Sequence, residues 1–158
     1  MAEAYIQILM ESLEKKNNVL DQIIALNKRQ IEIATTQPFD MIAYDKSMDE
    51  KGELIEELNR LDNGFVTTYE RIKDVVQAEP QKYRKKVLIL QDLVREATDK
   101  GTEIEVQEQR NKSALELAMR TKRHEIKQMK ISTSVASKYY KSMSKINDVD
   151  PQLMDRKK

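Results

Sequence analysis

The residues of this chain that could do chemistry are few, and none stands in a catalytic or metal-binding pattern. The one histidine, His124, is followed by Glu125, as at the start of the zinc-protease motif in which two histidines stand four residues apart. Gln128 occupies the place of the second histidine. Serines and threonines are plentiful, but they have no histidine partner for activation as nucleophiles. The chain has no cysteine, which excludes thiolate chemistry and a disulfide framework.

Phosphate and cofactor chemistry is no better supported. Gly52, Gly64 and Gly101 stand singly within helical patterns and form no glycine-rich phosphate loop. The carboxylates are typical of helix surfaces, as in the (i, i+4) pair Glu11 and Lys15. A metal site inside a helical bundle would need Glu-x-x-His motifs on facing helices, and the sequence has none. We therefore expect no enzyme, no cofactor and no metal site.

The composition favours long helices in one domain of 158 residues. Charged residues make up 35%, aromatic residues 5%, and there are three glycines and three prolines, too few for the turns of a β-sandwich or barrel. No run approaches the roughly 18 apolar residues of a membrane span. The N-terminus lacks the basic and apolar regions of a signal peptide. We expect a cytoplasmic protein without membrane insertion.

The charge is unevenly distributed along the chain. Residues 121–158 hold ten basic and four acidic residues, a net charge of +6, whereas residues 1–120 hold 18 basic and 23 acidic residues, a net charge of −5. The basic end fits either a solvated tail or a segment that binds an acidic partner surface. Basic clusters at 82–86 and 122–130 are typical of solvated helix faces, and with a total net charge of +1 we expect no nucleic-acid partner.

The strongest pattern is a seven-residue repeat that predicts a long helix with one seam against its neighbours. Three seam residues, Gly101, Glu108 and Asn111, are unusual in an apolar core. The two polar ones fit either a role in fixing the register between helices or contact with the backbone of a bound partner. The seam residues, spaced alternately by four and three, are Tyr83, Val87, Leu90, Val94, Ala97, Gly101, Ile104, Glu108, Asn111, Leu115 and Ala118.

Three helices are predicted, over about residues 3–35, 39–77 and 80–131. Pro38 separates the first two, with Asp40 in the first turn of the second. The Asn63-Gly64 pair does not break the second helix, because the apolar phase continues across it. Short connections make the helices antiparallel, so the expected fold is all-α, an elongated three-helix bundle or coiled coil over residues 1–131. Four polar residues interrupt the apolar stripes of the first two helices: Lys16, Asn27, Lys51 and Asp62.

The third helix is expected to outrun the second beyond about residue 118 and to join a basic, amphipathic tail at 132–158. The tail could fold back over this overhang, or the tail and the overhang together could bind a partner helix. The two interpretations are compatible if a partner can displace the tail. Methionines suit a surface that repacks around partners. The candidate partner-binding residues are Met119, Ile126, Met129, Ile131, Val135, Tyr139, Tyr140, Met143 and Ile146.

Part of the third helix resembles the signature of FlgN-type flagellar export chaperones. The break at Pro38-Phe39-Asp40, the run Gly52-Glu53-Leu54-Ile55 and the chain length also match that family. The matching third-helix residues are Arg95-Glu96-Ala97-Thr98-Asp99, then Ile104, then Gln107-Glu108-Gln109-Arg110-Asn111-Lys112. The candidate register and motif residues of this helix are Arg95, Gly101, Glu108, Arg110 and Asn111.

The resemblance implies a cytosolic chaperone of bacterial flagellum assembly and type III secretion. Such chaperones bind the C-terminal helices of hook–filament junction proteins and deliver them to the cytoplasmic domain of the export gate. A tyrosine of the tail contributes to gate docking in the family, which makes Tyr139 or Tyr140 the candidate here. The alternatives are a chaperone for another axial subunit such as the filament cap, a structural coiled-coil adaptor of the export apparatus, and a nucleic-acid-associated helical protein. The exposed stripe also leaves room for a homodimer.

Overall fold

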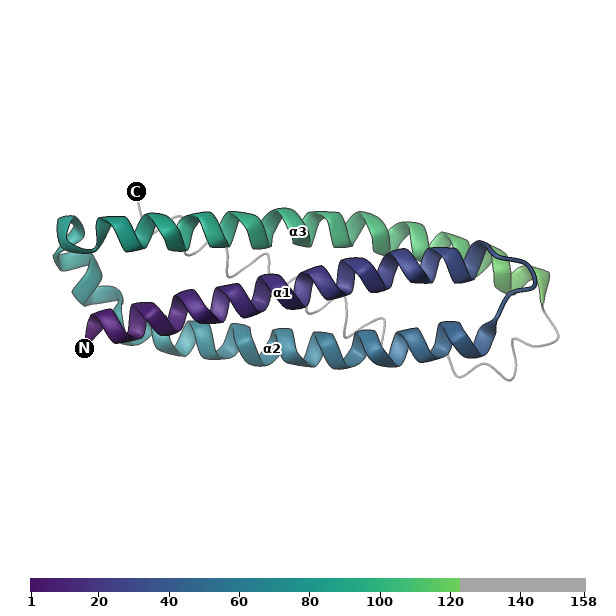
Figure 1. Ribbon diagram of the computed structural model, residues 1–158, viewed down its shortest axis with the longest axis horizontal. Helices are drawn as coiled ribbons and strands as arrows, with labels where there is room; N and C mark the ends of the chain where they lie inside the picture. The colour runs from purple at the N-terminus through teal and green to yellow at the C-terminus, as the bar shows by residue number, and fades with distance from the viewer. Residues whose placement is uncertain (123–158) are drawn as a thin grey trace.

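The computed structural model describes residues 1–122, which form three antiparallel helices and no strand (Figure 1). They are α1 (Ala2–Thr35), α2 (Met41–Ala78) and α3 (Pro80–Thr121). The expected all-α fold and the bundle arrangement are confirmed. The predicted continuation of the third helix to residue 131 and the predicted tail lie outside the described residues. None of the three helices is both long and apolar enough to cross a membrane.

The helix α1 lies between the other two (Figure 1). It packs along both α2 and α3, whereas α2 and α3 barely touch each other. Since it has neighbours on two sides, α1 buries a wide face that includes Asn17 and Leu26 besides the apolar residues of the hairpin and central clusters. Both outer helices therefore build their core contacts mainly on α1.

The connection between α1 and α2 is held by a helix cap and an apolar contact. The Asp40 Oδ1 atom accepts a hydrogen bond of 3.0 Å from the Ala43 amide, so Asp40 is the N-cap and α2 begins at Met41 rather than at residue 39. Phe39, just before the cap, packs edge-on against Tyr44 with ring centroids 6.0 Å apart. This is a hydrophobic staple, which fixes the angle at which the chain enters the helix.

The predicted course of α2 and the predicted seam of α3 agree with the structure. α2 continues without a break through Asn63 and Gly64. Every seam residue of α3 is buried except Val87 and Leu115, which are half-buried. Gln107, which the repeat does not include, is buried as well.

The core consists of three apolar clusters in succession along the bundle. They are called here by their positions, at the α2–α3 hairpin, at the centre, and at the α1–α2 connection. The hairpin cluster contains Ile6, Leu9, Leu13, Phe65, Ile72, Tyr83, Leu90 and Val94. The central cluster contains Val19, Leu20, Ile23, Ile24, Ile55, Leu58, Ala97 and Ile104. The connection cluster contains Ala34, Phe39, Tyr44, Met48 and Ala118.

Two layers of buried polar residues separate the clusters. The first layer lies between the hairpin and central clusters and contains Lys16, Asn17 and Asp62. The second layer lies between the central and connection clusters. It contains Asn27, Gln30, Ser47, Lys51, Gln107, Glu108 and Asn111. Apolar packing along the bundle is thus interrupted twice by groups that need specific partners.

Candidate binding groove

The second polar layer is centred on a buried lysine. The Lys51 side chain, 1% exposed, donates hydrogen bonds of 2.6 Å to Gln30 Oε1 and 2.9 Å to Glu108 Oε2. Burial lowers the pKa of Lys51, and the neighbouring Glu108 carboxylate opposes this shift in part. The ion pair joins α2 to α3, the two helices that otherwise barely touch.

Asparagine and glutamine side chains complete this layer. The Asn111 amide donates to the Asn27 carbonyl at 3.1 Å and to Gln30 Oε1 at 3.2 Å. The Asn27 amide in turn donates to Gln107 Oε1 at 3.2 Å. Glu108 and Asn111 therefore each bond to another helix, which is the arrangement that a register role requires. The role itself stays a prediction.

The first polar layer pairs two residues that interrupt the apolar stripes. Lys16 Nζ lies 3.1 Å from Asp62 Oδ1, and both side chains are buried. Beside them, the Asn17 amide donates to the Leu93 carbonyl at 3.2 Å and so connects α1 to α3. Both layers join neighbouring helices through hydrogen bonds and ion pairs. Within residues 1–122, no three His, Cys, Asp or Glu side chains gather where a metal ion could be held.

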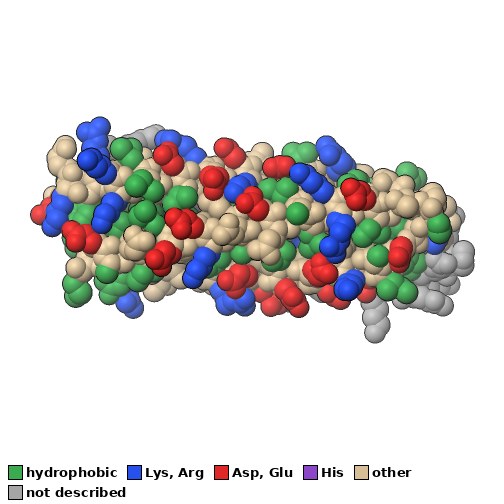
Figure 2. All heavy atoms as spheres, viewed as in Figure 1, with side chains coloured by type: hydrophobic (Ala, Val, Ile, Leu, Met, Phe, Trp, Pro, Cys, Tyr) green, Lys and Arg blue, Asp and Glu red, His purple; other side chains and the backbone are tan. Residues whose placement is uncertain are grey.

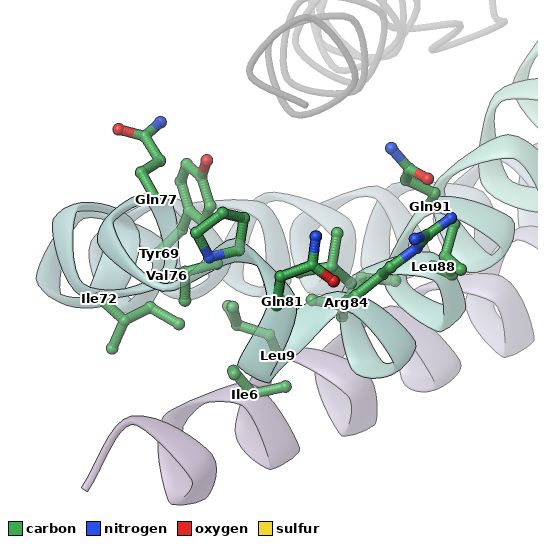
Figure 3. A pocket seen from close by; sticks show the side chains of 13 residues that line it. Ile6, Leu9, Tyr69, Ile72, Val76, Gln77, Gln81, Arg84, Leu88 and Gln91 are labelled. Carbon is green, nitrogen blue, oxygen red and sulfur yellow. The ribbon is translucent and has the colours of Figure 1, made fainter. Parts of the chain in front are cut away.

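A groove lies between α2 and α3 near the hairpin that joins them. Its cavity has a volume of about 490 Å³, within the range of ligand pockets. In Figure 3, Ile6 and Leu9 of α1 lie below the space, and the labelled side chains of α2 and α3 lie on opposite sides of it. The lining residues are Ile6, Leu9, Tyr69, Ile72, Val76, Gln77, Pro80, Gln81, Arg84, Val87, Leu88, Leu90 and Gln91. The groove thus has an apolar floor with glutamines and one arginine among its lining.

The α3 edge of this groove is both apolar and basic. Leu88 lines the cavity and remains 48% exposed. Arg84, one turn earlier, also lines it, and Lys85 follows on the exposed surface. Neither Arg84 nor Lys85 forms an ion pair with any described residue. On the face drawn in Figure 2, apolar side chains gather at the hairpin end of the molecule, with both basic and acidic side chains among them.

The α2 residues that line the cavity carry no charge, and two nearby lysines have acidic neighbours. Lys82 lies 3.7 Å from Glu79 and 5.4 Å from the centre of the Tyr83 ring, and its pKa is raised, first by Tyr83 and then by Glu79. On α2, Lys73 lies 2.7 Å from Glu70. The groove therefore has a neutral edge on α2 and a basic edge on α3.

Met119, the one predicted partner-binding residue within residues 1–122, does not line this groove. Met119 is half-buried at the opposite end of the bundle, beside Ala118 of the connection cluster. Lys122 Nζ donates to the Phe39 carbonyl at 2.7 Å and ties the end of α3 to the connection, and the predicted overhang continues beyond the described residues. The other partner-binding candidates lie outside the described residues: Ile126, Met129, Ile131, Val135, Tyr139, Tyr140, Met143 and Ile146.

The motif residues of α3 have different environments. Arg95 is exposed and lies 3.2 Å from Asp92, on the helix face that also carries Arg84 and Leu88. Arg110 is exposed and Gly101 is buried. The sequence analysis missed the groove. The signal that could have found it is Leu88, a large apolar residue outside the seam of α3.

Comparison of this chain with models of protein families, with curated proteins and with solved structures found no match.

Proposed function

We propose that this protein is a non-enzymatic, cytoplasmic chaperone that binds an amphipathic helix of another protein in the groove between α2 and α3. The observation that carries this proposal is the separation of α2 and α3 over an apolar floor provided by α1. A helix laid over Leu88, Val87 and Val76 would bury its apolar face against them, above the buried Ile6 and Leu9. This is the helix-in-groove mode of recognition, in which residues at i, i+3, i+4 and i+7 anchor the partner.

The shape of the bundle supports this choice of partner. The groove lies between α2 and α3 above α1. A fourth helix, about 10 Å across, placed along it would complete a four-helix packing at this end of the bundle. Burial of apolar surface on both sides would supply the driving force, at about 25 cal/mol per Å².

The resemblance to FlgN-type chaperones supplies the finer part of the proposal. From it we propose that hook–filament junction proteins are the cargo and that their C-terminal helices are the bound segment. The proposed destination is the cytoplasmic domain of the export gate. The signature and one wall of the groove lie on the same helix, α3, and Arg95 of the signature shares a face with Leu88. A tail tyrosine, Tyr139 or Tyr140, is proposed for gate docking.

The proposal is tested with purified full-length protein and the junction proteins of the same organism. We expect a stable complex by light scattering with the intact junction protein, and none after its C-terminal helix is deleted. Leu88→Gln should weaken binding by roughly tenfold or more, because the partner loses a buried leucine contact. The matched control is Ile42→Gln, since Ile42 is 84% exposed at the other end of α2.

Two results would count against the proposal in different ways. Binding of the filament-cap protein instead of the junction proteins would keep the chaperone function and change its cargo. Absence of a complex with every axial subunit would overturn the chaperone function.

A further inference from the structure

We propose that the groove selects a helix that carries Asp or Glu beside its apolar stripe, on the side that faces α3. This inference rests on the proposed function and specifies the chemistry of the partner. It also sets the orientation in which the partner helix lies across the bundle.

Basic and apolar side chains lie next to each other along the α3 edge of the groove. At 100° per residue, Arg84, Leu88 and Gln91 share one face of α3, and all three line the cavity. Lys85 lies next to Arg84 in the chain, is exposed and does not line the cavity, so a flexible lysine side chain there can reach only the outer flank of a bound helix. A helix seated on Leu88 would therefore have Arg84 and Lys85 along its flank.

The α2 and α3 edges of the groove differ in charge. On α2, Lys73 is neutralised by Glu70 at 2.7 Å. On α3, Lys82 is engaged by Glu79, but Arg84 and Lys85 have no acidic partner among the described residues. A carboxylate on the partner would meet an available guanidinium, which can bind it with two parallel hydrogen bonds. Charges at the edge of an interface set orientation and specificity more than affinity.

The same charges argue against two other occupants. The chain's own residues 121–158 carry a net charge of +6, and the stripe of Val135, Tyr139 and Met143 is interspersed with lysines. That segment would bring positive charge to a positive edge. A second copy joined face to face would likewise place Arg84 and Lys85 near those of its partner. An acidic amphipathic helix from another protein satisfies both the apolar floor and the basic edge.

The test uses two synthetic peptides that differ only in charge. Each has about 18 residues, or five turns of helix, with the same Leu and Ile stripe, flanked by Glu in one and by Lys in the other. Binding to the full-length protein is measured by fluorescence anisotropy. We expect the acidic peptide to bind roughly tenfold more tightly than the basic one, and added salt to reduce the difference.

Charge reversal of the edge should invert this preference. The double variant Arg84→Glu, Lys85→Glu should favour the basic peptide. The matched control is Lys28→Glu, Lys46→Glu, which makes the same change in net charge at exposed positions outside the groove and should keep the preference for the acidic peptide. Helix content and melting temperature of both variants confirm that they are folded.

A benzophenone side chain in place of Leu88 identifies the occupant. Cross-linking of the acidic peptide supports the inference, whereas cross-linking to residues 123–158 or to a second copy, undiminished by the peptide, overturns it. Equal binding of both peptides, lost in Leu88→Gln, would overturn the charge selectivity and leave helix binding in place. Binding of neither peptide would overturn the inference and the groove as a helix site together, while a complex with an intact junction protein would still support the chaperone function.

Discussion

At the scale of single residues, the most demanding contact is the ion pair between Lys51 and Glu108. The two charges lie 2.9 Å apart, and Gln30 provides a further acceptor for the lysine at 2.6 Å. Removing charges from water costs several kcal/mol per ion, which the attraction between them offsets only in this geometry. The pair is therefore weak as a source of stability but strong as a determinant of which residues face each other.

Single and double replacements of this pair should have very different effects. Lys51→Met or Glu108→Leu alone should lower the free energy of unfolding by about 3–5 kcal/mol, because each leaves one buried charge without its partner. The double variant should recover most of that loss. Urea unfolding of the four proteins in a double-mutant cycle measures the coupling. Simple addition of the two losses would contradict the assignment.

The exposed pair of Arg29 and Glu50 is the control for this cycle. Its atoms are 3.0 Å apart, close to the distance in the buried pair, but both side chains are exposed to solvent. Its coupling should be below about 1 kcal/mol. The difference between the two coupling energies then measures the effect of burial, because the two distances are nearly the same.

The sequence predicted the polar residues of the core better than their partners. Glu108 and Asn111 stand out because they break an apolar seam, and Lys16 and Asp62 because they interrupt apolar stripes. Their pairing depends on how far each helix slides along the next, which is set by the geometry of the connections. In the first two helices an antiparallel alignment about Pro38 does place Lys16 opposite Asp62, so this pair was within reach of the sequence.

At the scale of the helices, the limits of α1 and α2 differ from the predicted ones by one or two residues. The larger difference, at the start of α2, has a local cause, because Asp40 caps the helix and so stands just outside it. The continuity of α2 through Gly64 was predictable, since apolar phase outweighs a single glycine. That glycine still has a cost, because its backbone is free in the unfolded chain.

Replacing the glycines of α2 should stabilise the protein. A Cβ atom added at Gly64 or at Gly52 would meet nothing within 4 Å. Gly64→Ala and Gly52→Ala should each raise the free energy of unfolding by about 1 kcal/mol. The reverse change at an exposed helical site, Ala25→Gly in α1, should lower it by a similar amount. Thermal and chemical unfolding measure both, and a loss of stability in Gly64→Ala would show a packing role for this glycine.

At the scale of the whole molecule, the central position of α1 could not be predicted from the sequence. Periodicity tells which face of a helix is buried, but not whether one or two helices cover it. The wide buried face of α1, which includes Asn17 and Leu26, shows that a second helix covers α1. The groove near the α2–α3 hairpin was missed for the same reason, because it forms where both outer helices flank α1. Met119 lies at the other end of the bundle, and its part in partner binding stays a prediction.

The division of the core into three clusters predicts that the hairpin end opens before the rest. The hairpin cluster borders a cavity of about 490 Å³, so its side chains have fewer packing neighbours than those of a filled core. The Lys16–Asp62 layer separates it from the central cluster and limits how far such an opening spreads. Native-state hydrogen exchange should therefore show a lower opening free energy for amides of 65–76 and 83–94 than for those of 55–58 and 97–104.

The connection cluster separates this effect from ordinary fraying, since it also lies at an end of the bundle but borders no part of the groove. Amides of 44–48 should be better protected than those near the hairpin. Addition of the acidic peptide should then raise protection at the hairpin end, by the free energy of its binding, and leave the connection end unchanged. Equal protection at both ends of the free protein would mean that the cavity does not weaken the hairpin end. A peptide effect spread evenly over the three clusters would mean that the bundle opens as one unit.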